Sequence, residues 1–182
     1  MANLVLLNEG NAIVWADHAG DFGDSPMAGT TQGQITLAAL ASAAARQGAK
    51  VDLGDPRAEW YEVTLRLEWD VAPTDGTSAS LYFAPSPHGT AATANPGGAS
   101  GADAGYTATA GSTIAEGLAQ CDLVCVLPCT NDADTIIQQI TVLYKPPARY
   151  LSPIVLNSGG QALEGDDVEM SITMIPIPHE VQ

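Results

Sequence analysis

Hydrophobic and polar residues alternate along several segments of the chain, most regularly from Trp60 to Val71 (WYEVTLRLEWDV). The odd-numbered positions of this segment are apolar, and the even-numbered positions after Trp60 are polar or charged. A period of two residues is typical of a β-strand with one face on a core and the other in water. At the usual rise such a strand would be roughly 40 Å long. The segment therefore predicts a long strand in a sheet whose apolar face is covered by a second layer.

Similar patterns predict five more strands, at residues 78–84, 121–127, 135–144, 150–156 and 168–177. The turn signal PTDG at 73–76 separates the long strand from the next one, which predicts that the two form an antiparallel hairpin. Pro153 has no N–H group to donate to a neighbouring strand, so its strand is expected at a sheet edge or at a bulge.

Residues 35–47 fit two interpretations. The alanine content favours a helix over 37–46. The alternation of Ile35, Leu37 and Ala39 with small or polar residues fits a strand equally well. The sequence leaves both open.

Two stretches hold few residues that could form a core. Residues 1–34 mix short apolar runs with Asn, Gly and Asp, which predicts an extended arm with one or two short strands. Residues 85–112 are mostly Gly, Ala, Ser, Thr and Pro, with Tyr106 as the one large side chain. A loop of this length is usually functional or disordered, and we expect it to lie on a neighbouring molecule. The residues that follow predict one or two helical turns, with Ser112 or Thr113 as the N-cap.

Short strands separated by turn residues, without a βαβ rhythm, predict an all-β fold, an antiparallel β-sandwich. Six strands plus one or two near the N-terminus suit the eight strands of a jelly roll. An immunoglobulin-like sandwich is the alternative, but its Cys, Trp and Cys spacing is missing. We therefore expect one jelly-roll-like domain over 35–182, preceded by an extended N-terminal arm over 1–34.

The composition of the chain argues against several classes of function. The chain has 182 residues, 21 acidic against 6 basic side chains and a formal charge of −15, so it would be repelled by nucleic acid and by anionic membranes. No apolar run approaches the length of a transmembrane helix, and the N-terminus lacks the basic region of a secretory signal. Three cysteines are an odd number, which argues against a disulfide framework and for synthesis in a reducing cytoplasm.

Candidate metal ligands fall into three groups, and for each group we favour an interpretation without a metal. Two acidic loops could bind Ca²⁺, but neither has the spacing of an EF-hand, which favours solvated loops. The cysteines recur every four residues without a second, distant pair of ligands, so buried thiols are favoured over zinc. The residues concerned are Asp17, Asp21 and Asp24; Glu164, Asp166 and Asp167; and Cys121, Cys125 and Cys129.

The sequence carries no motif of a hydrolase, a metalloprotease or a phosphate-binding loop. His18, His88 and His179 are scattered over predicted loops and tails. A Ser-His-Asp triad stays open, because its members can be distant in sequence. We expect a non-enzymatic protein without a cofactor.

The three tryptophans suggest a different use of a sandwich, since Trp rings can stack on sugars. Trp69 lies on the apolar face of the long strand and is expected in the core. Trp60 begins that strand on its polar side and is the exposed candidate.

Three stretches together resemble a family of small virion structural proteins of tailed bacteriophages. They are TLAALASAAARQGAKVDLG, YEVTLRLEWDVAPTDGTSASLYFAPSPHGTAATANPGGASGADAGYT and ARYLSPIVLNSGGQALEGDDVEMSITMIPIPHEVQ, and the similarity covers residues 35–182. The most distinctive pieces are LYFAPSP, NPGG and the RY-SP-V-N-SG ending.

The resemblance implies a capsid decoration (cement) protein that binds the major capsid protein on the virion surface, and a homotrimer is expected. A tail or baseplate protein, or a carbohydrate-binding module, are the alternatives. No catalytic motif accompanies the resemblance. Extended segments of small residues can approach a partner closely. The residues expected at the partner interface are Leu4, Leu6, Trp15, Trp60, Pro96 and Tyr106.

Overall fold

The computed structural model of the protein describes residues 12–17, 31–132, 136–166 and 169–177. These residues form eleven strands, one short α-helix and one 3-10 helix. The strands are β1 (Ile13–Ala16), β2 (Thr31–Gln34), β3 (Ala45–Gln47), β4 (Val51–Asp52), β5 (Tyr61–Glu68), β6 (Ser78–Ser86), β7 (Ala104–Gly105), β8 (Asp122–Pro128), β9 (Ile137–Tyr144), β10 (Tyr150–Ser158) and β11 (Ser171–Pro176). The helices are η1 (Pro96–Gly98) and α1 (Ile114–Leu118).

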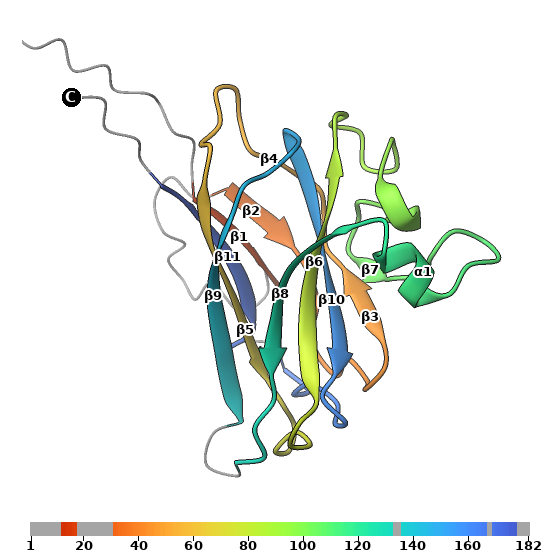
Figure 1. Ribbon diagram of the computed structural model, residues 1–182, viewed down its shortest axis with the longest axis vertical. Coiled ribbons are helices and arrows are strands. Elements are labelled where there is room, and N and C mark those ends of the chain that lie inside the picture. Colours follow the sequence, from red (N-terminus) through yellow and green to blue (C-terminus); the bar gives the residue numbers. More distant parts are fainter. Residues whose placement is uncertain (1–11, 18–30, 133–135, 167–168, 178–182) are drawn as a thin grey trace, which may run out of the picture.

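Two sheets face each other, and the all-β sandwich prediction is confirmed (Figure 1). The first sheet has the strand order β2-β1-β11-β5-β9, and the second has the order β7-β3-β10-β6-β8, with β4 also pairing with β10. Every pair is antiparallel except β1 and β2, which run parallel.

The core lies between the sheets and is built on the alternation of β5. Tyr61, Val63, Leu65 and Leu67 are fully buried, whereas the residues between them are exposed or half-buried. Phe83 of β6 faces them from the second sheet. Burying one large apolar side chain contributes about 1.5–3 kcal/mol, so these inward-facing residues are the main source of stability.

The predicted hairpin of β5 and β6 is wrong, because the two strands lie in different sheets. β5 pairs with β11 and β9, and β6 pairs with β10 and β8. Both strands have one apolar face. The connection of residues 69–77 carries the chain from one layer to the other, so that the apolar faces of β5 and β6 oppose each other across the core.

Pro153 lies in β10, which is an inner strand and not the predicted edge. The strand beside it is interrupted, since β3 ends before Gly48 and β4 begins after it. The Pro153 carbonyl accepts a hydrogen bond from Gly48 N at 2.8 Å. The Ser152 hydroxyl donates to the Gly48 carbonyl at 2.6 Å, which supplies a donor where proline has none. The gap between β3 and β4 therefore allows a proline inside the sheet.

Residues 35–44 form neither the helix nor a strand, and only β3 follows them. Ala39 and Ala43 have positive φ angles of 52° and 63°, which a helix excludes. The Asn157 side chain donates to the Leu40 carbonyl at 2.9 Å, and the Asn157 carbonyl accepts from Ala43 N at 2.7 Å. Contacts with distant strands therefore override the helix propensity of the alanines.

The domain begins before residue 35, because β1 and β2 belong to the first sheet. β1 lies between β2 and β11, and all four of its residues are buried. The arm predicted over 1–34 is therefore too long, although the one or two short strands expected there are present. Leu4 and Leu6 lie outside the described residues.

Candidate functional site

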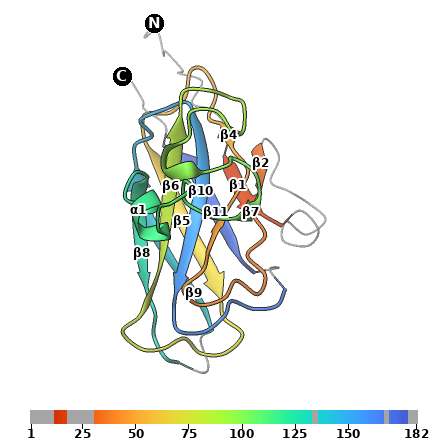
Figure 2. The same ribbon diagram turned by 90° about the vertical axis from the view of Figure 1, so that its right-hand side faces the viewer.

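The connection between β6 and β8 covers the outer face of the second sheet (Figure 2). We call residues 87–113 of this connection the cover loop. Under it lies a small apolar cluster separate from the main core. Its members are Ala45, Ala84 and Ile154 from the sheet, Ala99 and Tyr106 from the cover loop, and Leu118 from α1. The sequence suggested that this segment has too few large side chains to pack. Small alanines and one tyrosine are nevertheless enough to hold it against the sheet.

Tyr106 is 3% exposed, so its expected contact with a partner has to be corrected. Its hydroxyl donates to the Gly97 carbonyl at 2.6 Å, and burial raises the pKa of Tyr106 to about 12. Gly97 has a φ of 65°, and a Cβ there would lie 2.4 Å from the Gly117 carbonyl oxygen. Only glycine fits this position, which brings the cover loop against α1.

Lys50, between β3 and β4, fastens the beginning of the cover loop. Its ammonium donates to the Ser86 hydroxyl at 3.1 Å and to the carbonyls of His88, Thr90 and Thr93 at 3.0, 2.8 and 3.0 Å. An ammonium has three protons, so four oxygens share them. Burial lowers the pKa of Lys50, whereas the surrounding oxygens favour its charged form. The lysine thus acts as a cation enclosed by the loop.

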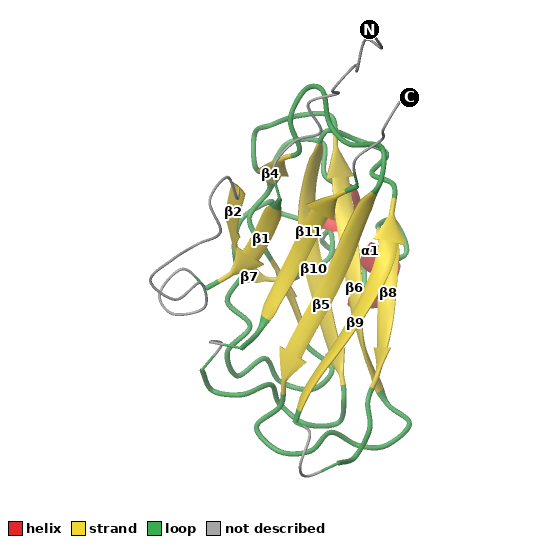
Figure 3. Cartoon of the chain, turned by 90° about the vertical axis from the view of Figure 1, so that its left-hand side faces the viewer, coloured by secondary structure: helices red, strands yellow, loops and turns green. Residues whose placement is uncertain are grey.

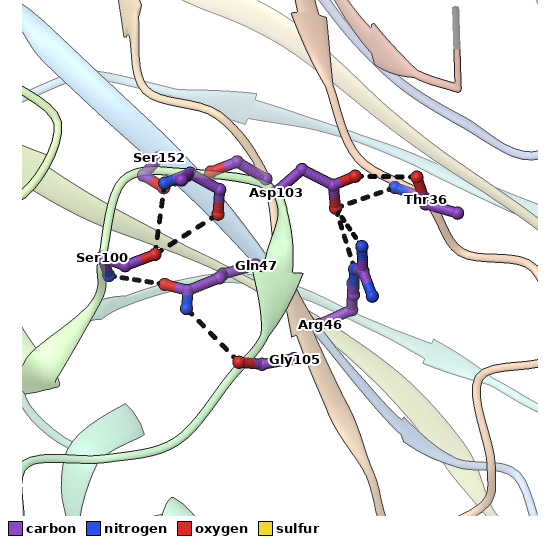
Figure 4. Close-up of polar contacts among 9 residues, drawn as sticks. Thr36, Arg46, Gln47, Ser100, Asp103, Gly105 and Ser152 are labelled. Atoms are coloured by element: carbon purple, nitrogen blue, oxygen red, sulfur yellow. Dashed lines mark hydrogen bonds and ion pairs between the residues drawn. The ribbon is translucent and has the colours of Figure 1, made fainter. Parts of the chain in front are cut away.

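Asp103 fastens the other half of the cover loop to the strands (Figure 4). Its carboxylate accepts from Thr36 N at 3.1 Å and from the Thr36 hydroxyl at 2.7 Å. It also pairs with Arg46 of β3, with Nε at 2.8 Å and Nη2 at 2.7 Å. Charge-assisted hydrogen bonds with two nitrogens of one guanidinium are among the stronger polar contacts in proteins.

Gln47, next to Arg46 in β3, is 3% exposed and bonds both ends of its amide to the cover loop (Figure 4). Its carbonyl oxygen accepts from Ser100 N at 2.7 Å, and its amide nitrogen donates to the Gly105 carbonyl at 3.4 Å. The cover loop is therefore held along its length by three side chains from one short stretch of the chain, from Arg46 to Lys50.

The cover loop ends at a helix cap that the sequence indicated. Thr113 is the N-cap of α1: its hydroxyl accepts from Glu116 N, and the Glu116 carboxylate accepts from Thr113 N at 2.7 Å. This reciprocal capping box fixes the start of the helix. Of the two residues predicted for the cap, Ser112 and Thr113, the second is confirmed.

The exposed side of the cover loop carries almost no charge. Between Asp75 and Glu116 the only Asp, Glu, Lys or Arg is Asp103, and Arg46 neutralises it. Apart from His88, the exposed residues are small or uncharged, and they include Gly89, Thr90, Ala91, Ala92, Thr93, Thr107, Thr109, Ala110 and Gly111. Depletion of charge is characteristic of the centres of protein interfaces. In a chain of charge −15 this surface is therefore the candidate contact site.

The other predicted contact residues are spread over the molecule. Trp15 is fully buried and packs on Phe83 with ring centroids 5.5 Å apart. The Trp15 side chain has no exposed surface with which to contact a partner, so the expectation that it lies at the partner interface is corrected. Pro96 is half-buried at the start of η1. Trp60 is 38% exposed, with the Lys145 ammonium 5.8 Å from its ring centroid.

Among the described residues, the candidate chemical groups do not come together in one site. Burial raises the pKa of Cys121 and of Cys125 to about 11 and also raises that of Cys129, so these thiols stay protonated near neutral pH. Within the described part of the chain no three His, Cys, Asp or Glu residues are placed to hold a metal ion. The candidates Asp21, Asp24, Asp167, His18 and His179 lie outside the described residues.

A shallow groove of about 360 Å³ lies between the ends of β8 and β9. Its lining has no ionisable side chain: Leu127, Pro128, Thr130, Ile137, Gln138, Gln139 and Ile140. Among the described residues, no helix has the length and apolar character needed to span a membrane.

Comparison with models of protein families finds no match to the chain, and comparison with curated proteins finds none either. The fold is an all-β sandwich, and one of its outer faces is covered by a loop whose exposed side is nearly free of charge.

Proposed function

We propose that the protein is a non-enzymatic structural component of a tailed-phage virion. In this proposal it binds the outside of the capsid as a decoration protein and contacts the major capsid protein through the cover loop. The observation that carries the proposal is that the cover loop is both neutral and firmly held. The sequence resemblance over residues 35–182 supports the phage assignment.

The strand order supports an architecture suited to such a role. If β2, β4 and β7 are set aside, the sheets are β1-β11-β5-β9 and β3-β10-β6-β8. We read this order as that of a jelly roll, because each sheet alternates strands from the two ends of the chain. Jelly rolls are found among viral capsid and lectin domains. This is a likeness of architecture and does not by itself define a function.

The rigidity of the cover loop favours binding to a repetitive surface. A loop that is already ordered loses less conformational entropy when it binds. The side chains of Lys50, Asp103 and Gln47 make nine hydrogen bonds within the chain, and eight of these join the cover loop to the rest of the molecule. On a capsid, many weak contacts of linked copies would give strong net attachment.

The test is binding of the purified protein to phage capsids assembled without it. Wild-type protein is expected to sediment with the capsids and to raise the temperature at which they release their contents. Introducing charge into the neutral surface by Thr107→Glu with Ala110→Glu should weaken binding at least about tenfold. Val71→Glu adds a charge at another exposed position and should leave binding unchanged. Wild-type protein that ignores capsids, or a double variant that binds normally, would refute the proposal.

The two alternatives make different predictions. A tail or baseplate protein would be found by labelled antibody on phage tails and not on heads. A carbohydrate-binding module is favoured only by the exposed ring of Trp60, which has polar neighbours. In that case wild-type protein should bind sugars on a glycan array, and Trp60→Ala should abolish the signal.

A further inference from the structure

Lys50 is bound by neutral oxygens and not by an acid. The chain has 21 acidic residues, yet Lys50 takes part in none of the ion pairs among the described residues. Its ammonium is instead surrounded by one hydroxyl and three backbone carbonyls, at 2.8–3.1 Å. We call these four oxygens the oxygen cradle; they belong to Ser86, His88, Thr90 and Thr93.

Contacts that do not involve Lys50 hold the oxygen cradle in shape. The Ser86 side chain is fully buried. Its hydroxyl lies 3.2 Å from the His88 carbonyl and 3.0 Å from the Thr93 carbonyl, and it accepts from His88 N at 3.2 Å. Thr93 N donates to the Thr90 carbonyl at 3.1 Å, which closes a turn. We therefore expect the cradle to keep its shape when the ammonium is removed.

The Asn95 side chain adds a brace on the far side of this turn. Its amide nitrogen donates to the Ala91 carbonyl at 2.6 Å and to the Ala99 carbonyl at 2.7 Å. The segment that carries three of the four oxygens is thus tied both to the end of β6, through Ser86, and to the next part of the cover loop.

The chemistry of the oxygen cradle indicates which ions it fits. Three carbonyls and a hydroxyl carry no formal charge, and potassium channels use backbone carbonyls in the same way, in place of the hydration shell of the ion. Ca²⁺ is bound mainly by carboxylates at about 2.3–2.6 Å, and Mg²⁺ at still shorter distances. The cradle oxygens lie 2.8–3.1 Å from the ammonium nitrogen. Because ammonium and K⁺ have nearly the same radius, the cradle fits K⁺ better than it fits a divalent ion.

We propose that the oxygen cradle is a binding site for a monovalent cation of the size of K⁺ or ammonium, and that Lys50 fills it from within the chain. A tethered ammonium has a high effective concentration at the site, so wild-type protein takes up no added cation there. When the side chain of Lys50 is shortened, the cradle binds K⁺ or ammonium from solution. This holds whether or not the protein binds a capsid.

The test is hydrogen exchange at residues 86–95 of full-length Lys50→Ala, which removes the ammonium and leaves its place empty. Exchange is compared in KCl, ammonium chloride and choline chloride at equal ionic strength. Choline screens charge equally but is too large for the cradle. Exchange should be at least about threefold slower in KCl or ammonium chloride than in choline chloride, as for a cation at about twice its dissociation constant. Wild-type protein should exchange equally in the three salts.

Two matched variants separate the oxygen cradle from other effects of salt. Lys50→Met also removes the charge, but its side chain still reaches the cradle and fills the space, so K⁺ should have no specific effect. Lys145→Ala removes the same charge from a lysine whose side chain is 55% exposed, and it should show no specific effect either. Circular dichroism checks the fold of each variant.

Slower exchange in KCl and ammonium chloride for Lys50→Ala alone would support the proposal, as would a Lys50→Ala variant that folds only in these salts. Equal exchange of folded Lys50→Ala in all three salts would overturn it. An effect specific to K⁺ in wild type, Lys50→Met or Lys145→Ala would also overturn it, since the ion would then bind elsewhere. So would a Lys50→Ala variant that is unfolded in every salt, because the cradle would then not form without the lysine.

Discussion

At the scale of single residues, Lys50 has the largest structural role that the sequence does not signal. It shares its protons among four oxygens, namely the Ser86 hydroxyl at the end of β6 and three carbonyls at the beginning of the cover loop. Lysine is usually found at the surface as a solvated charge, and no motif marks an enclosing loop around it. The contact depends on carbonyl groups, which every residue carries, so only the folded backbone shows it.

Replacing this ammonium should loosen the cover loop and leave the sandwich folded. Hydrogen bonds to charged groups are worth about 1.5–3 kcal/mol, and we expect Lys50→Met to lower the free energy of unfolding by about that amount. Hydrogen exchange should quicken at residues 86–95. Arg57→Met is the control, because Arg57 is exposed, and it should change the free energy by less than about 0.5 kcal/mol. Equal effects of the two changes would argue against a special role for Lys50.

Glu68, at the end of β5, gives the fold a pH dependence of known sign. Burial raises the pKa of Glu68, and the nearby acids Glu169, Glu164 and Asp166 raise it further. The folded state therefore keeps this proton at a pH where the unfolded chain has lost it. The resulting stabilisation is full below the normal carboxyl pKa and is lost as the pH rises through the raised pKa. Against Glu68→Gln, wild type should thus lose relative stability from about pH 4.5 upward, measured by urea unfolding. A constant difference would contradict the prediction.

At the scale of elements, β1 shows how much of the sandwich depends on the N-terminal part of the chain. Trp15 packs on Phe83, and its indole N–H donates to the Ala49 carbonyl at 2.8 Å. A Cβ on Gly33 of β2 would lie 2.3 Å from the Trp15 ring. The parallel strand can thus approach only because this residue is glycine.

The two tryptophans Trp15 and Trp60 should respond very differently to truncation. Trp15→Ala leaves a large cavity in the core and should cost about 3–5 kcal/mol. Trp60→Ala removes an exposed ring and should cost less than about 1 kcal/mol. Urea denaturation monitored by circular dichroism measures both. If Trp15→Ala were as mild as Trp60→Ala, β1 would not be part of the folded core.

The sequence predicted correctly those features that depend only on residues within one helix or strand. The alternation in β5 and the N-cap at Thr113 are local signals, and both are confirmed. The predicted hairpin of β5 with β6 is wrong, and the sequence could not decide between helix and strand for residues 35–47, because contacts with distant strands determine both features. The sequence did point to the segment that forms the cover loop, through its length and composition. It could not show that this segment packs on its own molecule, since the packing depends on Tyr106 reaching Gly97.

At the scale of the whole molecule, the two outer faces of the sandwich differ in how they are covered. One sheet is covered by the cover loop and α1 (Figure 2). They pack on its apolar residues, and the exposed side of the cover loop is nearly uncharged. In the other sheet, no described helix or loop lies in front of the outer face of β9, β5 and β11 (Figure 3).

The excess negative charge should make both the stability and the self-association of the protein depend on salt. A formal charge of −15 opposes the compact state and opposes the approach of a second copy, and salt screens both effects over about 10 Å at 0.1 M. The Tm should therefore rise with NaCl concentration, by about 2–4 °C for each kcal/mol gained. The control is the same titration near the isoelectric point of about 4.1, where the net charge vanishes and the effect of salt should shrink. A Tm that falls with salt near neutral pH would mean that attractive ion pairs outweigh the repulsion of the excess acids.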